Sequence, residues 1–131
     1  LMQRYDIVLC EGSGGALVPL AGSLLLSDYA AQLGVPAVIV SANKLGCINH
    51  TLLTVEALRS RDIPVLGIAF IRVLAEADEI IAEDNVETVR KLSGVAVLGE
   101  LDWLERPDAY STGFDRLGEA FLERWDVFND G

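Results

Sequence analysis

The sequence predicts a parallel α/β fold, in which a β-sheet is covered by helices on its faces. Three observations predict it. Short, β-branched apolar segments alternate with longer segments of helical periodicity. The apolar segments are hydrophobic at consecutive positions, as is typical of strands buried on both faces. The helical segments are long enough to connect one parallel strand to the next. The length predicts that residues 1–131 form one domain or part of one.

The chain opens with a predicted strand and a short helix. Asp6–Cys10 is apolar and β-branched, which predicts a buried strand with Cys10 in the core. Ser27–Leu33 has the pattern of a short helix. Ser27 is the expected N-cap, and Gly34 the expected end of the helix.

The middle of the chain predicts two strands around an amphipathic helix. Pro36–Val40 and Pro64–Ile71 are short apolar segments that favour buried strands. Between them, Ile48–Arg61 shows helical spacing of its apolar residues. The side chains expected on the buried face of this helix are Ile48, Leu52, Val55 and Leu58.

The last third predicts two more helices and a fourth strand. Ala75–Leu92 favours a long acidic helix, Val95–Leu98 a strand, and Thr112–Trp125 a closing helix. The first of these helices is expected to bury Ile80, Val86 and Val89. The last is expected to bury Phe114, Leu117, Phe121 and Leu122.

Composition excludes several classes of function. Hydrophobic residues make up 51% of the chain, which is enough for a core. The net charge of −10 argues against nucleic acid and anionic membranes as partners. The most apolar stretch, Ala16–Leu26, is shorter than the roughly 18 residues of a membrane span. It also lacks the basic region of a signal peptide.

The cysteines and the histidine suggest reduced, cytoplasmic surroundings without a histidine-based metal centre. Cys10 and Cys47 are the only cysteines, and they have neither metal-ligand nor redox spacing. His50 is the only histidine, so no cluster of histidines can form.

The segment that follows the first predicted strand has the composition of a metal and phosphate site. Glu11 directly follows the predicted strand, and Gly12, Gly14 and Gly15 come next. Ligands of parallel sheets bind beyond the carboxyl ends of the strands. A carboxylate there suits Mg²⁺, and glycines let backbone N–H groups approach an anion. A solvated carboxylate and an ordinary glycine turn would account for the same residues.

A second segment with the features of a binding site follows the next predicted strand. In VIVSANKLGCINH, Lys44 and Gly46 precede a helix that begins near Asn49. Free N–H groups at a helix start, with a lysine beside them, favour an anion. Ordinary capping by Asn49, with Lys44 facing water, is the alternative. Cys47 lies at the same helix start, where we expect its backbone to be the functional part.

These two segments together resemble dethiobiotin synthetase, the ATP-dependent enzyme that closes the ureido ring in biotin synthesis. The pattern E-G-x-G-G occurs within VLCEGSGGALVPL, and L-G-x-I-N-H-T within KLGCINHTLLTVEAL. Neither pattern is specific by itself, but their combination is. The resemblance extends to about Glu105, and its matching segments are Val8–Leu20, Leu26–Asp28, Lys44–Leu58, Ile63–Gly67 and Leu98–Leu104.

The resemblance implies a P-loop NTPase-like, three-layer fold of Rossmann type and a cytoplasmic homodimer. Glu11 would bind Mg²⁺ at the ATP phosphates and so serve as the catalytic residue. Gly12, Gly14 and Gly15 would lie along the path of 7,8-diaminopelargonate and phosphate. The carboxylate of a diaminopelargonate bound mainly to the other subunit would be held by Gly46, Cys47 and Asn49. The implied reaction joins CO₂ or bicarbonate to the two amines with the help of ATP.

The sequence departs from the family in two main respects and one smaller one. It contains no G-x-x-x-x-G-K-[ST] motif, so the resemblance implies a C-terminal portion whose N-terminal P-loop half is supplied elsewhere. Leu1 is not an initiator methionine, which leaves three alternatives open: an artificial boundary, a processed product or the second half of a larger domain. Ile71 falls where the family has an asparagine that binds the adenine edge. Asp102 replaces a common proline in the nearby loop.

Two alternatives remain beside a dethiobiotin synthetase that is active with its P-loop half. One is a non-catalytic relative that keeps a dimer surface and an anion site, for binding or regulation. The other is a P-loop amidoligase of the cobyrinic acid diamide synthase type, although the segment LGCINH argues against it.

Overall fold

The computed structural model describes residues 4–76, 78–106 and 112–130. Its strands are β1 (Pro19–Ala21), β2 (Leu24–Leu25), β3 (Ala37–Asn43), β4 (Val65–Arg72) and β5 (Val97–Leu101). Its helices are α1 (Leu26–Leu33), α2 (Cys47–Arg59), α3 (Glu79–Ser93) and α4 (Thr112–Asn129). The predicted helices and all predicted strands except the first are therefore confirmed, with ends that differ by a few residues.

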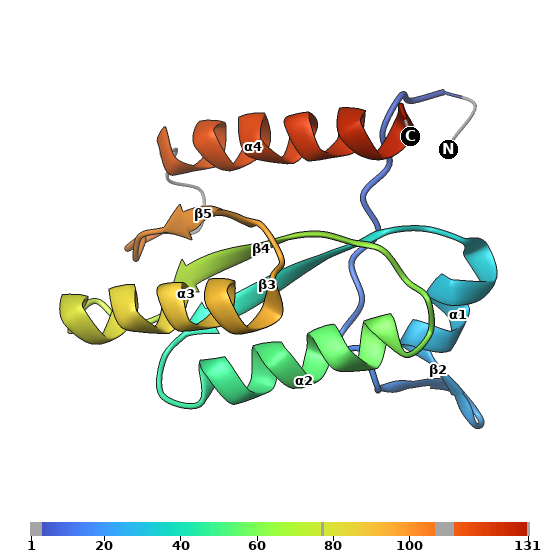
Figure 1. Ribbon diagram of the computed structural model, residues 1–131, viewed down its shortest axis with the longest axis horizontal. Helices are drawn as coiled ribbons and strands as arrows, with labels where there is room; N and C mark the ends of the chain where they lie inside the picture. The colour runs from blue at the N-terminus through green and yellow to red at the C-terminus, as the bar shows by residue number, and fades with distance from the viewer. Residues whose placement is uncertain (1–3, 77, 107–111, 131) are drawn as a thin grey trace.

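The fold has three layers around a parallel sheet. The sheet has the strand order β3-β4-β5, and both of its strand pairs are parallel. Helices α2 and α3 cover one face of the sheet and α4 covers the other (Figure 1). This arrangement confirms the predicted α/β fold class, a mostly parallel sheet flanked by helices.

A small antiparallel hairpin, which the sequence did not predict, lies apart from this sheet. It is formed by β1 and β2, and Gly22 in its turn has a φ of +59°. The hairpin leads directly into α1. Its strands have three and two residues, which is too short for an alternation of apolar and polar residues to be recognised.

The main core lies between the sheet and the helices α2 and α3. Phe70 and Ile68 of β4 and Val89 of α3 are completely buried there. The other buried members of this core are Ile39, Cys47, Val55, Leu58, Ile63 and Val95. Val55 and Leu58 confirm the predicted inner face of α2, and Ile48 packs against the core from the same helix.

The helix starts use caps that partly differ from the expected ones. The N-cap of α1 is Leu25, whose backbone N–H donates to the carboxylate of Asp28 at 3.1 Å. The prediction of Ser27 as the cap was wrong, because Ser27 lies inside the first turn and is buried. Gly34 ends α1 with a φ of +64°, as predicted. Asp78 caps α3 by accepting from Ile80 N at 3.0 Å, so this helix begins later than predicted.

The prediction of a strand over Asp6–Cys10 was wrong. Within the described residues, this segment pairs with no strand and runs as an irregular trace beside the sheet (Figure 1). Cys10 is exposed rather than in the core, and Leu9 is 78% exposed. The physical reason is that a strand needs a neighbour to bond its N–H and C=O groups. An apolar, β-branched sequence alone does not provide one.

Two helices bury the predicted faces only in part. In α3, Val89 is completely buried and Val86 packs against the core, as predicted. Ile80 is 78% exposed, because it lies off the buried stripe of Ala82, Asn85, Val89 and Ser93. In α4, Phe114 and Leu122 are nearly half exposed, while Leu117 and Phe121 are only partly buried. The reason is that α4 packs mainly on β4 and β5, so its flanks extend beyond the sheet.

Candidate functional site

The glycines after Glu11 shape a tight, exposed loop against the hairpin. Gly14 has a φ of +91°, and a Cβ there would lie 2.7 Å from Cγ2 of Val18. A Cβ at Gly12 would collide with the side chain of Leu26. The positive φ and the contact with Val18 favour glycine at Gly14, whereas a side chain at Gly12 requires the Leu26 side chain to move. A Cβ at Gly15 would have no neighbour within 4 Å, so the backbone of Gly15 is open on that side.

Glu11 is exposed on this loop and fits one part of a metal site. Within the described ranges, no group of three His, Cys, Asp or Glu side chains is close enough to hold a metal ion. Mg²⁺ commonly binds through one or two carboxylates, with water and phosphate oxygens completing its octahedral shell. A single exposed carboxylate beside open glycine backbone fits that kind of site. It does not fit a metal cage made of protein groups alone.

The loop before α2 presents an uncapped helix start. Gly46 is the N-cap residue, with a φ of +91°, and no side chain bonds to the first turn. Cys47 N donates to Lys44 O at 2.9 Å, and His50 N donates to Gly46 O at 3.1 Å. Lys44 and Asn49 are both exposed. The alternative of capping by Asn49 is therefore wrong, and the helix start keeps the features that favour an anion.

Cys47 points inward from the same loop. Only 3% of this residue is exposed, and its thiol lies 3.8 Å from Oδ1 of Asn43, to which it donates. A ligand at the helix start would therefore meet the backbone of Cys47 and not its sulfur. This burial agrees with the expected backbone role at that position.

The two predicted halves of the site are not adjacent within one chain. The glycine segment belongs to the blue trace that passes the C-terminal half of α2, whereas the Lys44–Asn49 loop lies at the opposite end of that helix (Figure 1). The resemblance assigned the second half to a ligand bound mainly to another subunit, so this separation leaves both assignments as predictions.

Sequence reasoning missed a buried polar cluster at the carboxyl ends of the three strands. Asn43, the last residue of β3, is 4% exposed and donates to Glu100 Oε1 at 2.7 Å. Its Oδ1 accepts from Nδ2 of Asn85 at 2.9 Å. Polar residues at the ends of consecutive predicted strands, such as Asn43 and Arg72, were the available signal. The contacts themselves span up to 57 residues of sequence.

Arg72, the last residue of β4, joins this cluster to a neighbouring cleft. It donates to Glu79 at 2.5 Å and to Glu100 Oε2 at 3.3 Å, and it forms a longer ion pair with Asp102. The hydrogen bond to Glu79, and next the bond to Glu100, raise the pKa of Arg72 above its ordinary value. The hydrogen bond between Arg72 and Glu79 also lowers the pKa of Glu79. The cleft has a volume of about 240 Å³, and Trp103 forms part of its wall.

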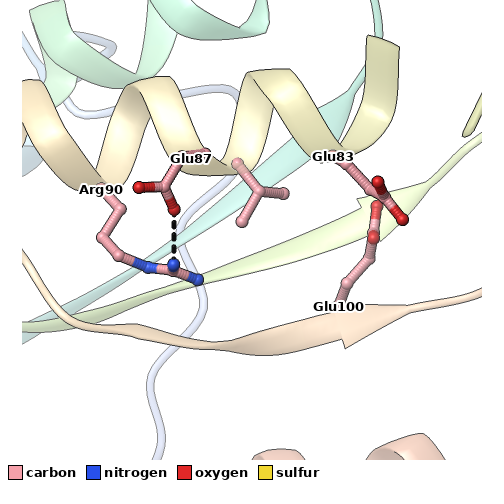
Figure 2. A pocket seen from close by; sticks show the side chains of 5 residues that line it. Glu83, Glu87, Arg90 and Glu100 are labelled. Atoms are coloured by element: carbon pink, nitrogen blue, oxygen red, sulfur yellow. Dashed lines mark hydrogen bonds and ion pairs between the residues drawn. The ribbon is translucent and has the colours of Figure 1, made fainter. Parts of the chain in front are cut away.

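A second hollow lies between α3 and β5. Its volume is about 310 Å³. Figure 2 shows Glu83 of α3 and Glu100 of β5 pointing toward one another at one end, while Glu87 pairs with Arg90 at the other. The ion pair between Glu87 and Arg90 measures 2.6 Å and is exposed. The lining of the hollow is mainly acidic, so the hollow offers no place for a phosphate.

The parallel sheet and its flanking helices define a P-loop NTPase-like α/β protein. The chain belongs to the AAA domain family, whose family model matches residues 1–110.

Within this family, the chain is similar to proteins named ATP-dependent dethiobiotin synthetase BioD. It is 38% identical to the protein of Halalkalibacterium halodurans over 96% of this chain and 52% of the relative. It is 48% identical to that of Rhizorhabdus wittichii over 78% of this chain and 46% of the relative. For Methanococcus aeolicus, the identity is 39% over 89% of this chain and 54% of the relative. The chain therefore spans about half the length of the curated relatives that it matches.

None of the helices in the described part of the chain combines the length and the hydrophobicity that a membrane crossing requires.

Proposed function

We propose that this chain is the C-terminal portion of a dethiobiotin synthetase, acting in biotin synthesis together with a P-loop half supplied elsewhere. The observation that carries the proposal is its identity of 38% to 48% with ATP-dependent dethiobiotin synthetases over most of its length. The proposed substrates are 7,8-diaminopelargonate, CO₂ or bicarbonate, and ATP.

The proposed reaction has three steps on the substrates. One amine of diaminopelargonate and CO₂ form a carbamate. The γ-phosphate of ATP is transferred to the carbamate oxygen, which gives a mixed anhydride and ADP. The second amine then attacks the carbonyl carbon, and phosphate leaves as the ring closes. Positioning and electrostatics dominate such phosphoryl transfers.

The residues of this chain have separate roles in the proposal. Glu11 is exposed and holds Mg²⁺, which neutralises phosphate charge when bound. The open backbone at Gly15 allows close approach of an anionic group. The uncapped start of α2, at Gly46 and Asn49, binds the carboxylate of diaminopelargonate through backbone N–H groups and the Asn49 amide.

The free edge of β3 is the proposed binding place of the P-loop half. In the described residues, β3 pairs only with β4, so its other edge is free. Val40 of β3 is 62% exposed, and α4 packs mainly on the neighbouring strands. A free, apolar edge strand accepts another strand readily. We propose that the missing half completes the sheet there and brings the phosphate-binding lysine that this chain lacks.

The test is dethiobiotin formation from diaminopelargonate, bicarbonate and MgATP. This chain is assayed alone and together with the part of the H. halodurans relative that the match leaves out. Product is expected only in the mixture. In that mixture, Glu11→Gln is expected to lower the rate about 100-fold or more, because a charge-stabilising group is lost. Glu56→Gln, an exposed acid on α2, is the matched control and leaves the rate unchanged.

The absence of product from a folded and associated mixture would contradict the proposal. It would favour the alternative of a non-catalytic relative that binds without reacting. One observation favours that alternative. Ile71 is half-buried at the register position of Leu101, and its apolar side chain offers no hydrogen bond to an adenine edge. Measuring ATP binding to the mixture separates loss of nucleotide binding from loss of chemistry.

A further inference from the structure

Asn43 is a saturated hydrogen-bonding centre at the end of β3. Its Nδ2 donates to Ala82 O at 3.0 Å and to Glu100 Oε1 at 2.7 Å. Its Oδ1 accepts from Asn85 Nδ2 and from the thiol of Cys47. A carbonyl and a carboxylate only accept, so the orientation of the Asn43 amide is determined by its partners. One buried side chain thus joins β3 to α2, α3 and β5.

Glu100 extends this connection from Asn43 to the cleft. While Oε1 of Glu100 accepts from Asn43, Oε2 accepts from Arg72 at 3.3 Å. Arg72 in turn holds Glu79, the first residue of α3, at 2.5 Å. The chain of contacts therefore runs from Cys47, at the start of α2, to Glu79, at the start of α3.

We propose that Asn43 and Glu100 are positioning residues that couple the Lys44–Asn49 loop to the cleft at the ends of β4 and β5. The inference rests on the proposed function only in that this loop is the proposed carboxylate site. Cys47 follows Asn43 by four residues, so one amide holds both sides of the turn over residues 44–46. A change at the cleft that moves Arg72 must move Glu100, and through it the amide that holds the loop.

Burial gives this coupling its strength. Asn43 is 4% exposed, and Asn85 beside it is 8% exposed. Water cannot easily replace a hydrogen-bond partner lost at such a position. Each polar group left unpaired there favours opening of the start of α2. Glu83 faces Glu100 across the hollow (Figure 2), so Glu100 depends on Arg72 and Asn43 for compensation of its charge.

The buried thiol of Cys47 provides a direct measure of loop opening. At 3% exposure, it reacts with an aromatic disulfide reagent only after the start of α2 opens. The exposed Cys10 is first replaced by serine, so that Cys47 is the only thiol. Reaction rates are then followed in this chain alone, without substrate, across low concentrations of urea.

We expect Glu100→Gln to raise the rate at low urea roughly 2- to 30-fold, the range for changes along a coupled network. Glutamine can still accept from Asn43, but its amide group opposes Arg72 instead of pairing with it. Glu87→Gln is the matched control, because Glu87 lines the same hollow and pairs only with the exposed Arg90 in the described residues. It leaves the rate unchanged. Asn43→Ser removes the Asn43 amide, and we expect it to raise the reaction rate of the Cys47 thiol at least as much as Glu100→Gln does.

A second control separates local opening from general instability. Val95→Ala removes buried volume at the other end of the sheet, and it speeds the reaction only through global unfolding, whose rate rises steeply with urea. Glu100→Gln is expected to raise the part of the rate that does not depend on urea. If Glu100→Gln behaves like Val95→Ala or like Glu87→Gln, the coupling is disproved. Because no substrate is used, this result is independent of whether the proposed enzyme activity is found.

Discussion

Gly14 and Gly22 show how single residues shape the chain beside the candidate site. Both have positive φ values, +91° and +59°, which favour glycine. Their surroundings differ, because a Cβ at Gly14 would lie 2.7 Å from Val18 while a Cβ at Gly22 would have no neighbour within 4 Å. The glycine-rich segment therefore has a structural requirement at Gly14 in addition to any role in binding.

We predict that Gly14→Ala lowers the free energy of unfolding more than Gly22→Ala does. A left-handed backbone costs an alanine about 1 to 2 kcal/mol at either position. The contact with Val18 adds strain at Gly14, for a total of about 3 kcal/mol. Urea unfolding followed by circular dichroism measures both values. Equal losses would mean that the segment around Val18 moves without cost.

At the scale of elements, one ion pair ties α1 to the end of α2. Arg61, just after α2, donates to Asp28 of α1 at 2.7 Å. Asp28 also accepts from the backbone N–H of Leu25. The hydrogen bond from Arg61, and next that from Leu25, lower the pKa of Asp28.

We predict that this pair contributes stability at neutral pH and loses it in acid. A carboxyl whose pKa is lowered by folding stabilises the fold above its ordinary pKa. That contribution disappears as the pH falls through the lowered value. In Arg61→Ala, the free energy of unfolding should therefore fall less between neutral and acidic pH than in the parent. Arg59→Ala is the control, because Arg59 is an exposed arginine at the end of α2. If the free energy of unfolding has the same pH dependence in the parent and in Arg61→Ala, the ion pair does not contribute the predicted stability.

At the scale of the whole molecule, the sheet is covered unevenly. One face is covered by α2 and α3, whereas on the other face α4 lies mainly over β4 and β5, and Val40 of β3 is exposed. β3 has seven residues, no charged side chain and a free edge within the described residues. Such an edge favours pairing with another chain.

We predict that the chain alone associates with itself as its concentration rises, and that Val40→Lys weakens this association. Val40 is 62% exposed on the uncovered part of β3, so a lysine there does not disturb the core. Leu53→Lys on the outer side of α2, where Leu53 is 55% exposed, is the control. Light scattering over a dilution series measures the mass. A monomer at every concentration would contradict the prediction.

The candidate site was only partly predictable from the sequence. Glycines and a carboxylate at Glu11, and a glycine at the start of a helix at Gly46, are local patterns whose chemistry follows from residue type. The contact of Asn43 with Glu100 is not local, since 57 residues separate them. No periodicity connects two such positions, so neither was expected to be functional.

Local pattern by itself determined where most strands and helices lie, because consecutive apolar residues and helical spacing are properties of neighbouring residues. It also determined the α/β class, since strands and helices alternate along the chain. Tertiary structure alone decided that Asp6–Cys10 stays unpaired, that Ile80 faces solvent, and that Asn43 joins three other elements. The physical reason is that hydrogen-bond partners and buried faces depend on which elements pack together. That packing involves residues far apart in the chain, and local propensity carries no information about them.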